Sequence, residues 1–218
     1  MVRNYFKKAE KMLHPQTKLK WISDAKGFGV FATAPLPKGT VTFVQDLLDV
    51  CIDLNDPLLD RPEYKQIVDK YSYINNESQL VISWDHGKYM NHCCFSNTLT
   101  TGYGFEIAVR DIEAGEEITD NYGIFTIHHN MEMSCPKQNC YKRVSIDDFE
   151  KHSEAWDKEI TEALQEFNTL DQPLKCFLTP ETLNDLELYL STSNGYISVT
   201  NQKPGIKERK LYNEKLKS

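Results

Sequence analysis

Short segments rich in β-branched and aromatic residues dominate the first half of this 218-residue chain. Such residues favour the pleated packing of strands. Turn residues separate the segments, as in Pro37-Lys38-Gly39 and Glu113-Ala114-Gly115. The pattern therefore predicts many short strands between about residues 17 and 125. The clearest predicted strands are 19–22, 29–32, 40–44, 80–84 and 105–109.

Two other parts of the chain have helical periodicity. Residues 64, 67, 68 and 71 (Tyr, Ile, Val, Tyr) follow the spacing of one helix face and predict a helical insert among the strands. Beyond Ser145 we expect two more helices, the first N-capped by Ser145 and the second beginning at Thr179-Pro180, with Gly195 just past its end. Their apolar stripes are Phe149, Trp156, Ile160, Ala163, Leu164 and Phe167, then Leu183, Leu186, Tyr189 and Leu190.

The composition argues against a secreted or membrane protein. Residues 1–20 are polar and basic without an apolar run, which is unlike a secretory signal. No stretch approaches the roughly 20 apolar residues that a membrane span requires. We expect an intracellular protein with no membrane partner, cytoplasmic if bacterial and nuclear or cytoplasmic if eukaryotic.

The charge is unevenly distributed. Residues 1–20 carry a net charge of +5 and residues 203–218 carry +4, which leaves −16 for the rest of a chain whose total is −7. An acidic body argues against nucleic acid as the main partner, because phosphate binding needs a basic surface. It is compatible with a lysine-rich peptide or basic protein substrate. An ordinary solubilising surface explains the same charge equally well.

Three separated motifs concentrate small and polar residues. In the first, Gly27-Phe28-Gly29, two glycines flank an aromatic residue before a strand, so the backbone can turn sharply or approach a ligand closely. The second, residues 89–97, reads Tyr-Met-Asn-His-Cys-Cys-Phe-Ser-Asn. The third, residues 111–123, is an acidic turn leading into a strand that ends at Tyr122-Gly123. Each alone has a plain structural explanation, such as a turn, a cap or a surface tyrosine.

In this order, Gly-x-Gly, then Asn-His-x-Cys-x-x-Asn, then Gly-Glu-Glu-Ile-Thr-x-x-Tyr-Gly, the motifs resemble the signature of SET-domain protein lysine methyltransferases. The resemblance covers about residues 19–122. It implies a mainly β SET fold of several small sheets with knot-like threading, a helical insert and an α-helical C-terminal extension. The domains expected are an N-terminal segment (1–16), a SET domain (17–125), a post-SET-like cysteine loop (126–145) and a helical C-terminal region (146–218).

The resemblance also implies a cofactor and a reaction, the transfer of a methyl group from S-adenosylmethionine to a lysine side chain. That amine must first lose its proton, and its ordinary pKa is ~10.4. A dry channel beside a sulfonium disfavours the ammonium, so orientation matters more than a strong base. The implied roles are cofactor binding for Gly27, Phe28, Gly29, Tyr89, Asn91, His92 and Tyr122, catalysis for Tyr122, and walls of the lysine channel for Tyr103 and Phe125.

Asp120 departs from the family pattern, which usually has Phe or Tyr two residues before the tyrosine. A carboxylate inside the lysine channel would stabilise the ammonium and oppose methylation. Either Asp120 points to solvent, or the channel is built differently here. The number of methyl groups added is therefore left open.

The cysteines also depart from the pattern. Many relatives hold one Zn²⁺ with the Cys of the second motif and a later Cys-x-Cys-x4-Cys, of which this chain keeps Cys94, Cys135 and Cys140. A structural zinc site needs four ligands, and Met133 is a poor substitute. The fourth ligand would be Cys93, His128 or His129; alternatively the loop holds free thiols without metal. Cys51 and Cys176 stand alone, and we expect both to be buried, inert thiols.

Three other functions remain open. A non-catalytic SET module could bind a lysine-bearing peptide, a methyltransferase could act on a small molecule or nucleic acid, and the C-terminal helices could belong to a scaffold. These helices could equally shape substrate access or form a dimer. The expected partner is a basic protein, such as a histone or ribosomal protein.

Overall fold

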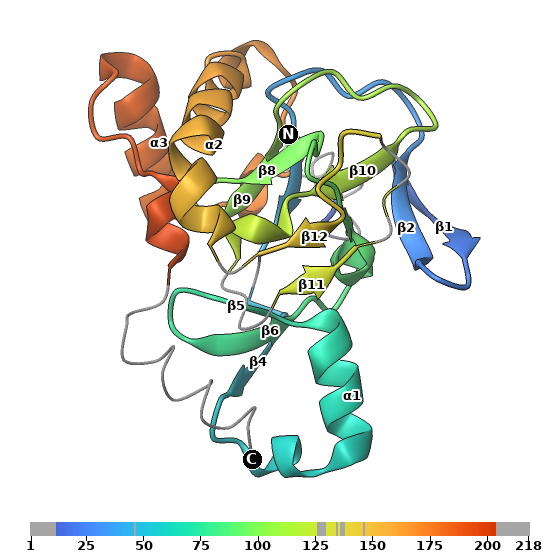
Figure 1. Cartoon of the computed structure of the whole chain (residues 1–218). Helices are drawn as coiled ribbons and strands as arrows, with labels where there is room; N and C mark the ends of the chain where they lie inside the picture. The colour runs from blue at the N-terminus through green and yellow to red at the C-terminus, as the bar shows by residue number, and fades with distance from the viewer. Residues whose placement is uncertain are drawn as a thin grey trace, which may run out of the picture.

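The computed structural model describes residues 12–45, 47–125, 130–133, 135, 138–145 and 147–203. The strands in this part of the chain form several small sheets, with helices gathered at the C-terminal end and in one insert (Figure 1). The predicted mainly β SET fold with a helical insert and a helical extension is confirmed. The strands are β1 (Thr17–Ser23), β2 (Gly27–Ala32), β3 (Val41–Val44), β4 (Val50–Asp53), β5 (Tyr73–Ile74), β6 (Gln79–Ile82), β7 (Asn91–His92), β8 (Thr98–Thr100), β9 (Phe105–Ala108), β10 (Glu117–Asp120), β11 (Met131–Glu132) and β12 (Arg143–Val144).

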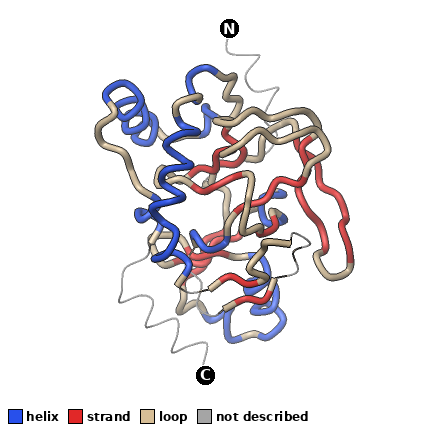
Figure 2. Tube along the Cα trace, turned by 45° about the horizontal axis from the view of Figure 1, so that its top comes forward, coloured by secondary structure: helices blue, strands red, loops and turns tan. Residues whose placement is uncertain are grey.

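One sheet unites the three sequence motifs. Its strand order is β1-β2-β10-β7, with β2 antiparallel to both of its neighbours and β7 parallel to β10. The β1–β2 hairpin extends from one side of the molecule (Figure 2). Since β2, β7 and β10 carry the first, second and third motif, strand pairing alone brings together segments about 90 residues apart. We call β2, β7 and β10 the motif sheet.

A second sheet, β3-β9-β8, shares a hydrophobic core with the C-terminal extension. The side chain of Gln172 ties the two together, since Oε1 accepts from Val41 N (2.9 Å) and Nε2 donates to Gly39 O (2.7 Å). The extension is therefore part of the core and not an appendage. Core members from both parts include Val41, Leu99, Phe105 and Ile107 from the sheet region, and Trp156, Ile160, Leu164, Phe167 and Leu186 from the extension.

The two C-terminal helices are α2 (Asp148–Leu164) and α3 (Pro180–Thr192). Thr179 caps α3 as predicted, its side chain accepting from Thr182 N. Ser145 is not the N-cap of α2, because Asp147 occupies that position; the Asp148 carboxylate instead accepts from Ser145 N (2.8 Å). In the described part of the chain, no helix has the length and apolarity needed to cross a bilayer.

The insert contains the sheet β4-β6-β5 and the helix α1 (Pro62–Tyr71). It has a small core of its own, formed by Ile52, Leu54, Val68, Ile74 and Leu80. The predicted helix is confirmed, but its predicted apolar face is not. Tyr64 and Ile67 are 38% and 53% exposed, because a three-stranded sheet covers little more than Val68.

The expectation of buried thiols at Cys51 and Cys176 is wrong, since both side chains are exposed. Cys51 lies on β4, where only Ile52 points into the core of the insert. Cys176 lies in a 3-10 turn (Lys175–Phe177) without a buried residue. Both are isolated from the other cysteines.

Candidate active site

Gly27, Phe28 and Asn91 form the first part of the candidate site. Asn91 Nδ2 donates to Phe28 O (3.0 Å) and to Glu117 Oε1 (2.8 Å), which ties β7 to both β2 and β10. At Gly29, a Cβ atom would lie 2.6 Å from Ile22 Cδ1 and 2.8 Å from Glu117 Oε1. Gly27 has a φ of +73°, and the position of its missing Cβ is open. Both glycines therefore serve the geometry predicted from the motif.

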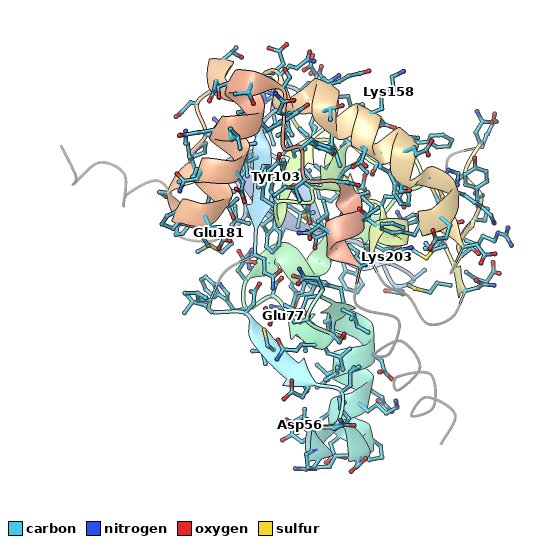
Figure 3. The ribbon with its side chains drawn as sticks, turned by 90° about the vertical axis from the view of Figure 1, so that its left-hand side faces the viewer. Asp56, Glu77, Tyr103, Lys158, Glu181 and Lys203 are labelled. Atoms are coloured by element: carbon cyan, nitrogen blue, oxygen red, sulfur yellow. The ribbon has the colours of Figure 1, made fainter. Side chains whose placement is uncertain are left out.

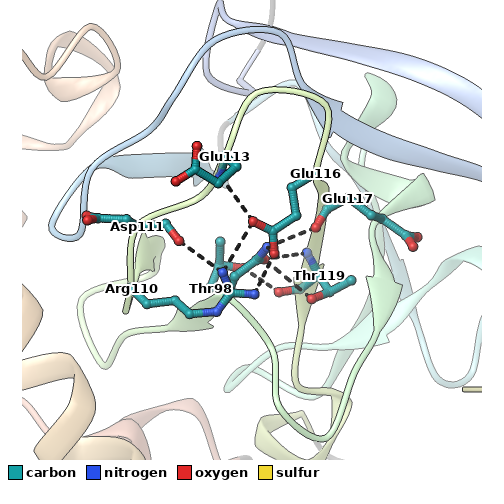
Figure 4. A network of polar contacts seen from close by, with 8 residues as sticks. Thr98, Arg110, Asp111, Glu113, Glu116, Glu117 and Thr119 are labelled. Atoms are coloured by element: carbon teal, nitrogen blue, oxygen red, sulfur yellow. Dashed lines mark hydrogen bonds and ion pairs between the residues drawn. The ribbon is translucent and has the colours of Figure 1, made fainter. Parts of the chain in front are cut away.

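The last residue of the second motif, Asn97, fixes β10. Its Oδ1 accepts from Thr119 N (2.8 Å), and its Nδ2 donates to Glu117 O (2.8 Å) and Glu116 Oε1 (3.2 Å). The carboxylate of Glu116, which accepts from Asn97, also forms an ion pair with Arg110 (Figure 4). Asn97 is almost fully buried, so we assign it a structural role: it holds β10, the strand that precedes Tyr122, in place.

Tyr122 follows β10 in the 3-10 turn η4 (Tyr122–Ile124) and is held at two points. Its backbone N donates to His92 Nδ1 (3.1 Å), and its hydroxyl donates to Met90 O (2.6 Å). Burial lowers the pKa of His92 to about 4, so the ring is neutral and accepts through Nδ1. Burial, followed by the nearby Asp120, raises the pKa of Tyr122 well above its usual range. The phenol therefore keeps its proton and has a lone pair left to accept a hydrogen bond.

Tyr122 also lines a cavity of about 420 Å³. Phe125 and Tyr73 lie beside it, with ring centroids 4.9 Å apart, and Tyr122 is 6.4 Å from Phe125. The insert supplies one part of the wall, and the sheets supply the other. Further residues on the wall include Tyr71, Met90, Thr100, Phe105, Glu106 and Asp120.

Asp120 does not point to solvent. Its side chain is 1% exposed and lines the cavity, so of the two alternatives the second holds and the channel is built differently here. A second carboxyl, Glu106 on β9, also lines the cavity and is 6% exposed. The sequence analysis missed Glu106. The signal was a single acid inside the otherwise apolar strand Phe105–Ala108.

The structure does not bring Tyr103 to this cavity. Its ring is 7% exposed in the core under the C-terminal extension, and its hydroxyl accepts from Ile197 N (3.3 Å). Figure 3 shows Tyr103 near α3 and the last described residues. It packs 6.3 Å from Tyr196 and is absent from the residues that line the cavity. Of the two aromatic residues predicted to line the lysine channel, Phe125 therefore lines the cavity and Tyr103 does not.

Phe28 and Tyr89, both predicted to contact the cofactor, lie together. Their ring centroids are 5.6 Å apart in an edge-to-face arrangement, within a row that continues to Trp21 on one side and Tyr71 on the other. Because Tyr71 lines the cavity, this row of aromatic rings connects the β1–β2 hairpin to the insert.

The cysteines of the second motif and the later loop also gather. Cys93, Cys135 and Cys140 form a buried cluster with Cys94 packed against it. Cys94 Sγ lies 3.3 Å from Cys140 Sγ and 3.3 Å from His92 Nε2. Thiols are suitable donors for zinc. Even so, no group of three or more His, Cys, Asp or Glu side chains in the described ranges is arranged to hold a metal ion. His128 and His129, proposed as a fourth ligand, lie outside the described residues.

Comparisons with known proteins bear on the same region. Residues 27–123 match the family model of the SET domain, a span that contains all three motifs. A search of curated proteins gave no match. Among solved structures, a Plasmodium falciparum protein named as a candidate histone methyltransferase is 17% identical with a TM-score of 0.36, over 49% of this chain and 92% of that one. A likeness of this size adds no argument about activity.

Residues 27–123 therefore form a SET domain, as the resemblance predicted. The motif sheet, with Tyr122 at the end of β10, is the part of the fold that carries the family's signature.

Proposed function

We propose that this protein transfers a methyl group from S-adenosylmethionine to the side-chain amine of a lysine in a protein substrate. The observation that carries the assignment is the position of Tyr122. It is bonded to His92 and Met90 at the end of the motif sheet, and it lines the cavity that contains Phe125 and Asp120. A residue in that position can act on a cofactor and a substrate at the same time.

The residues of the motif sheet fit the cofactor. S-adenosylmethionine supplies an electrophilic methyl group on a sulfonium. The open position beside Gly27 lets a ligand approach the backbone closely, and Asn91 holds the Phe28 carbonyl in a fixed orientation. Gly27–Gly29, Tyr89, Asn91 and His92 would hold the group, with neutral His92 adding no positive charge near a sulfonium.

Tyr122 then orients the substrate amine. Because its hydroxyl proton is engaged by Met90 O, the oxygen is an acceptor toward the cavity. It can receive an N–H from the amine and place a lone pair near a cationic methyl group. Phe125 and Tyr73 give the cavity aromatic walls that exclude water and suit a cationic head on an aliphatic stem.

The substrate class is a basic protein or peptide, such as a histone or ribosomal protein. The net charge of −16 outside the two basic ends favours a lysine-rich partner over nucleic acid. We place the reaction inside the cell, where such proteins are found. The number of methyl groups added is not assigned.

Labelled S-adenosylmethionine incubated with a cell extract and the purified protein tests the assignment. We expect label in protein, and a loss of about 100-fold or more in Tyr122→Phe with cofactor affinity nearly unchanged, as when one preorganised polar group is removed from a reaction centre. Tyr141→Phe, at a 62% exposed tyrosine, is the matched control and should keep full activity. Retained turnover in Tyr122→Phe rejects the role of Tyr122. Label in RNA or metabolites instead supports the rival methyltransferase.

A non-catalytic SET module is the second candidate, favoured by the two buried carboxyls in the cavity. Carboxyl groups there stabilise a bound ammonium. This candidate predicts that a lysine peptide binds with or without cofactor and that no substrate in the extract becomes labelled. The labelling experiment therefore decides between the two.

Zinc at the cysteine cluster stays a prediction from the family resemblance. Cys94, Cys135 and Cys140 have the right donor chemistry, but the fourth ligand of a structural site is not assigned. Elemental analysis of protein purified without added metal tests it: about one zinc per chain supports a four-ligand site, and less than about half rejects it.

A further inference from the structure

Two carboxyl groups share the wall of the cavity beside Tyr122. Glu106 comes from β9 and Asp120 from β10, and β8 lies against both strands. Thr98 Oγ1 is 3.4 Å from Glu106 Oε2, and Thr100 Oγ1 donates to Asp120 Oδ2 (2.9 Å). Among the described residues, neither carboxyl forms an ion pair with a Lys, Arg or His. Two buried acids without a paired cation are costly unless the site receives a cation or a proton.

The two carboxyls are hydrogen-bonded unequally. Asp120 accepts two strong bonds, from Asn121 N (2.7 Å) and from Thr100 Oγ1. Glu106 has a longer contact with the Thr98 hydroxyl (3.4 Å), and that hydroxyl lies closer to Thr119 O (3.0 Å), which takes its single proton. Donors stabilise the ionised form, so the charge belongs on Asp120 and the proton on Glu106. Burial raises the pKa of Asp120 to about 6, and burial followed by the charge on Asp120 raises the pKa of Glu106 well above its usual range.

We infer that Asp120, with neutral Glu106 beside it, accepts the proton that the substrate lysine must lose before methyl transfer. This role rests on the proposed function and adds a catalytic residue to it. It also adds a proton acceptor to a reaction for which we expected orientation to matter more than a strong base.

The proton transfer balances in atoms and charge. The N–H bond of the ammonium breaks, an O–H bond forms on Asp120, and the freed lone pair attacks the methyl carbon while the C–S electron pair stays on sulfur. Before the transfer, a dry cavity holds two buried charges, the ammonium and the carboxylate, and both lack water. After the transfer, it holds a neutral amine and a neutral carboxylic acid, so no charge is buried. Burial therefore favours the transfer, although in water an ammonium of pKa ~10.4 would keep its proton.

Three other charged groups near the acid pair are engaged elsewhere. Lys88 Nζ donates to three backbone carbonyls, Asp85 accepts from Met12 N and Gly87 N, and Glu117 is paired with Lys26. Burial raises the pKa of Tyr73 as it does that of Tyr122, so neither phenol is a base at neutral pH. Among the described residues, the other titratable groups that line the cavity are Asp69, Lys70, Tyr71, Tyr73, Lys88 and Tyr122. Asp49, Asp85 and Glu117 act on these groups through their charge, and His92 contacts Tyr122.

The pH dependence of kcat/KM in Asp120→Asn tests the role of Asp120. The wild-type protein should reach half of its plateau near pH 6, because Asp120 ionises there and then accepts the proton of a bound ammonium. Asp120→Asn should be about 100-fold or more slower at pH 7, the usual contribution of a general base, and its rate should keep rising toward pH ~10 as the free amine forms in solution. Glu106→Gln, which mimics the neutral acid, should stay within about tenfold of wild type at pH 7.

Two outcomes overturn this role. An Asp120→Asn protein that is as active as wild type at pH 7, or more active, means that the carboxylate only holds the ammonium and opposes methylation. An unchanged pH profile means that another group takes the proton. Cofactor affinity and thermal unfolding of each variant establish that the site is intact. If Asp120→Asn does not fold, Thr100→Val replaces it: losing the hydroxyl donor should move the acid limb of the profile to higher pH, and an unmoved limb overturns the role.

The charge assignment has a readout that does not need activity. The infrared spectrum of the wild-type protein at pH 7 should contain the band of a protonated carboxyl that disappears in Glu106→Gln. If the wild type labels no substrate, the proposed function fails; if this band is missing, the acid pair is not arranged as inferred. The two failures are therefore distinguishable.

Discussion

The motif sheet and the cavity meet at Tyr122 but are built in different ways. In the motif sheet, three short strands bring their residues together by backbone pairing. The side chain of Asn91 adds bonds to β2 and β10, and that of Asn97, just before β8, adds bonds to β10. The wall of the cavity comes from the insert, from β8 and β9, and from the end of β10, and its residues meet through packing. One half of the site is therefore set by strand register and the other by how separate units pack.

The residues that match the family pattern lie on the motif sheet, and the residues that depart from it lie on the wall of the cavity. Gly27, Gly29, Asn91 and His92 belong to the motifs that resemble the family signature, whereas Asp120 stands where that pattern usually has an aromatic residue, and Glu106 adds a second acid to the same cavity. We expect substitutions on the two sides to separate cofactor binding from substrate chemistry.

The largest effect that separates the two sides is expected for Asn91→Ala. It removes hydrogen bonds to Phe28 O and to the charged Glu117, which we expect to weaken cofactor binding by about 10- to 100-fold, or about 1.4–2.8 kcal/mol. The KM for peptide at saturating cofactor should change little. Calorimetric titration with S-adenosylhomocysteine measures the affinity, and Asn55→Ala, at an exposed asparagine, is the control. An unchanged affinity contradicts the role of the motif sheet.

On acidification, His92 on the motif sheet and Asp120 in the cavity should change the free energy of unfolding in opposite directions. The pKa of His92 is about 4 when folded and 6.5 ordinarily, so the unfolded chain binds more protons between these values and stability falls as pH falls through them. The pKa of Asp120 is about 6 when folded and 3.8 ordinarily, so the folded chain binds more protons and stability rises as pH falls from 7 toward 4.

Urea unfolding at pH 7 and pH 5 in the presence of EDTA measures both terms. Between these pH values His92 should cost about 2 kcal/mol and Asp120 should contribute about 1 kcal/mol. Relative to wild type, His92→Gln should therefore lose less stability on acidification, and Asp120→Asn should lose more. The same shift in both variants would contradict the contrast between the two sides.

The smallest effect is expected for Phe125→Ala on the cavity side. Losing one aromatic wall should lower kcat/KM for a lysine peptide by about 2- to 10-fold, the size of an aromatic contact of about 0.5–1.5 kcal/mol. Cofactor affinity should not change, because Phe125 lies beside Tyr73 and not on the motif sheet. Tyr64→Ala, on the exposed side of α1, is the control. A loss of cofactor affinity in Phe125→Ala would show that the two sides are not separable.

Much of the fold was predictable from local patterns. β-branched segments predicted the strands, and Thr179-Pro180 marked the start of α3, because capping and pleating depend on neighbours in the chain. The errors fell where burial depends on a distant partner. Ile67 lies on a helix as predicted but is exposed, since its sheet is too small to cover it. Tyr103 looked like a channel aromatic, yet the C-terminal extension buries it in a core.

The sequence by itself identified the three motifs and singled out Tyr122, because each motif is a short local pattern of residues in a fixed order along the chain. Only the tertiary structure decided what Tyr122 faces. Glu106 and Asp120 are 14 positions apart on different strands, and nothing local indicates that both side chains line one cavity. Their ionisation depends on burial and on the donor hydroxyl of Thr100, which reaches Asp120 only once β8 packs against β10.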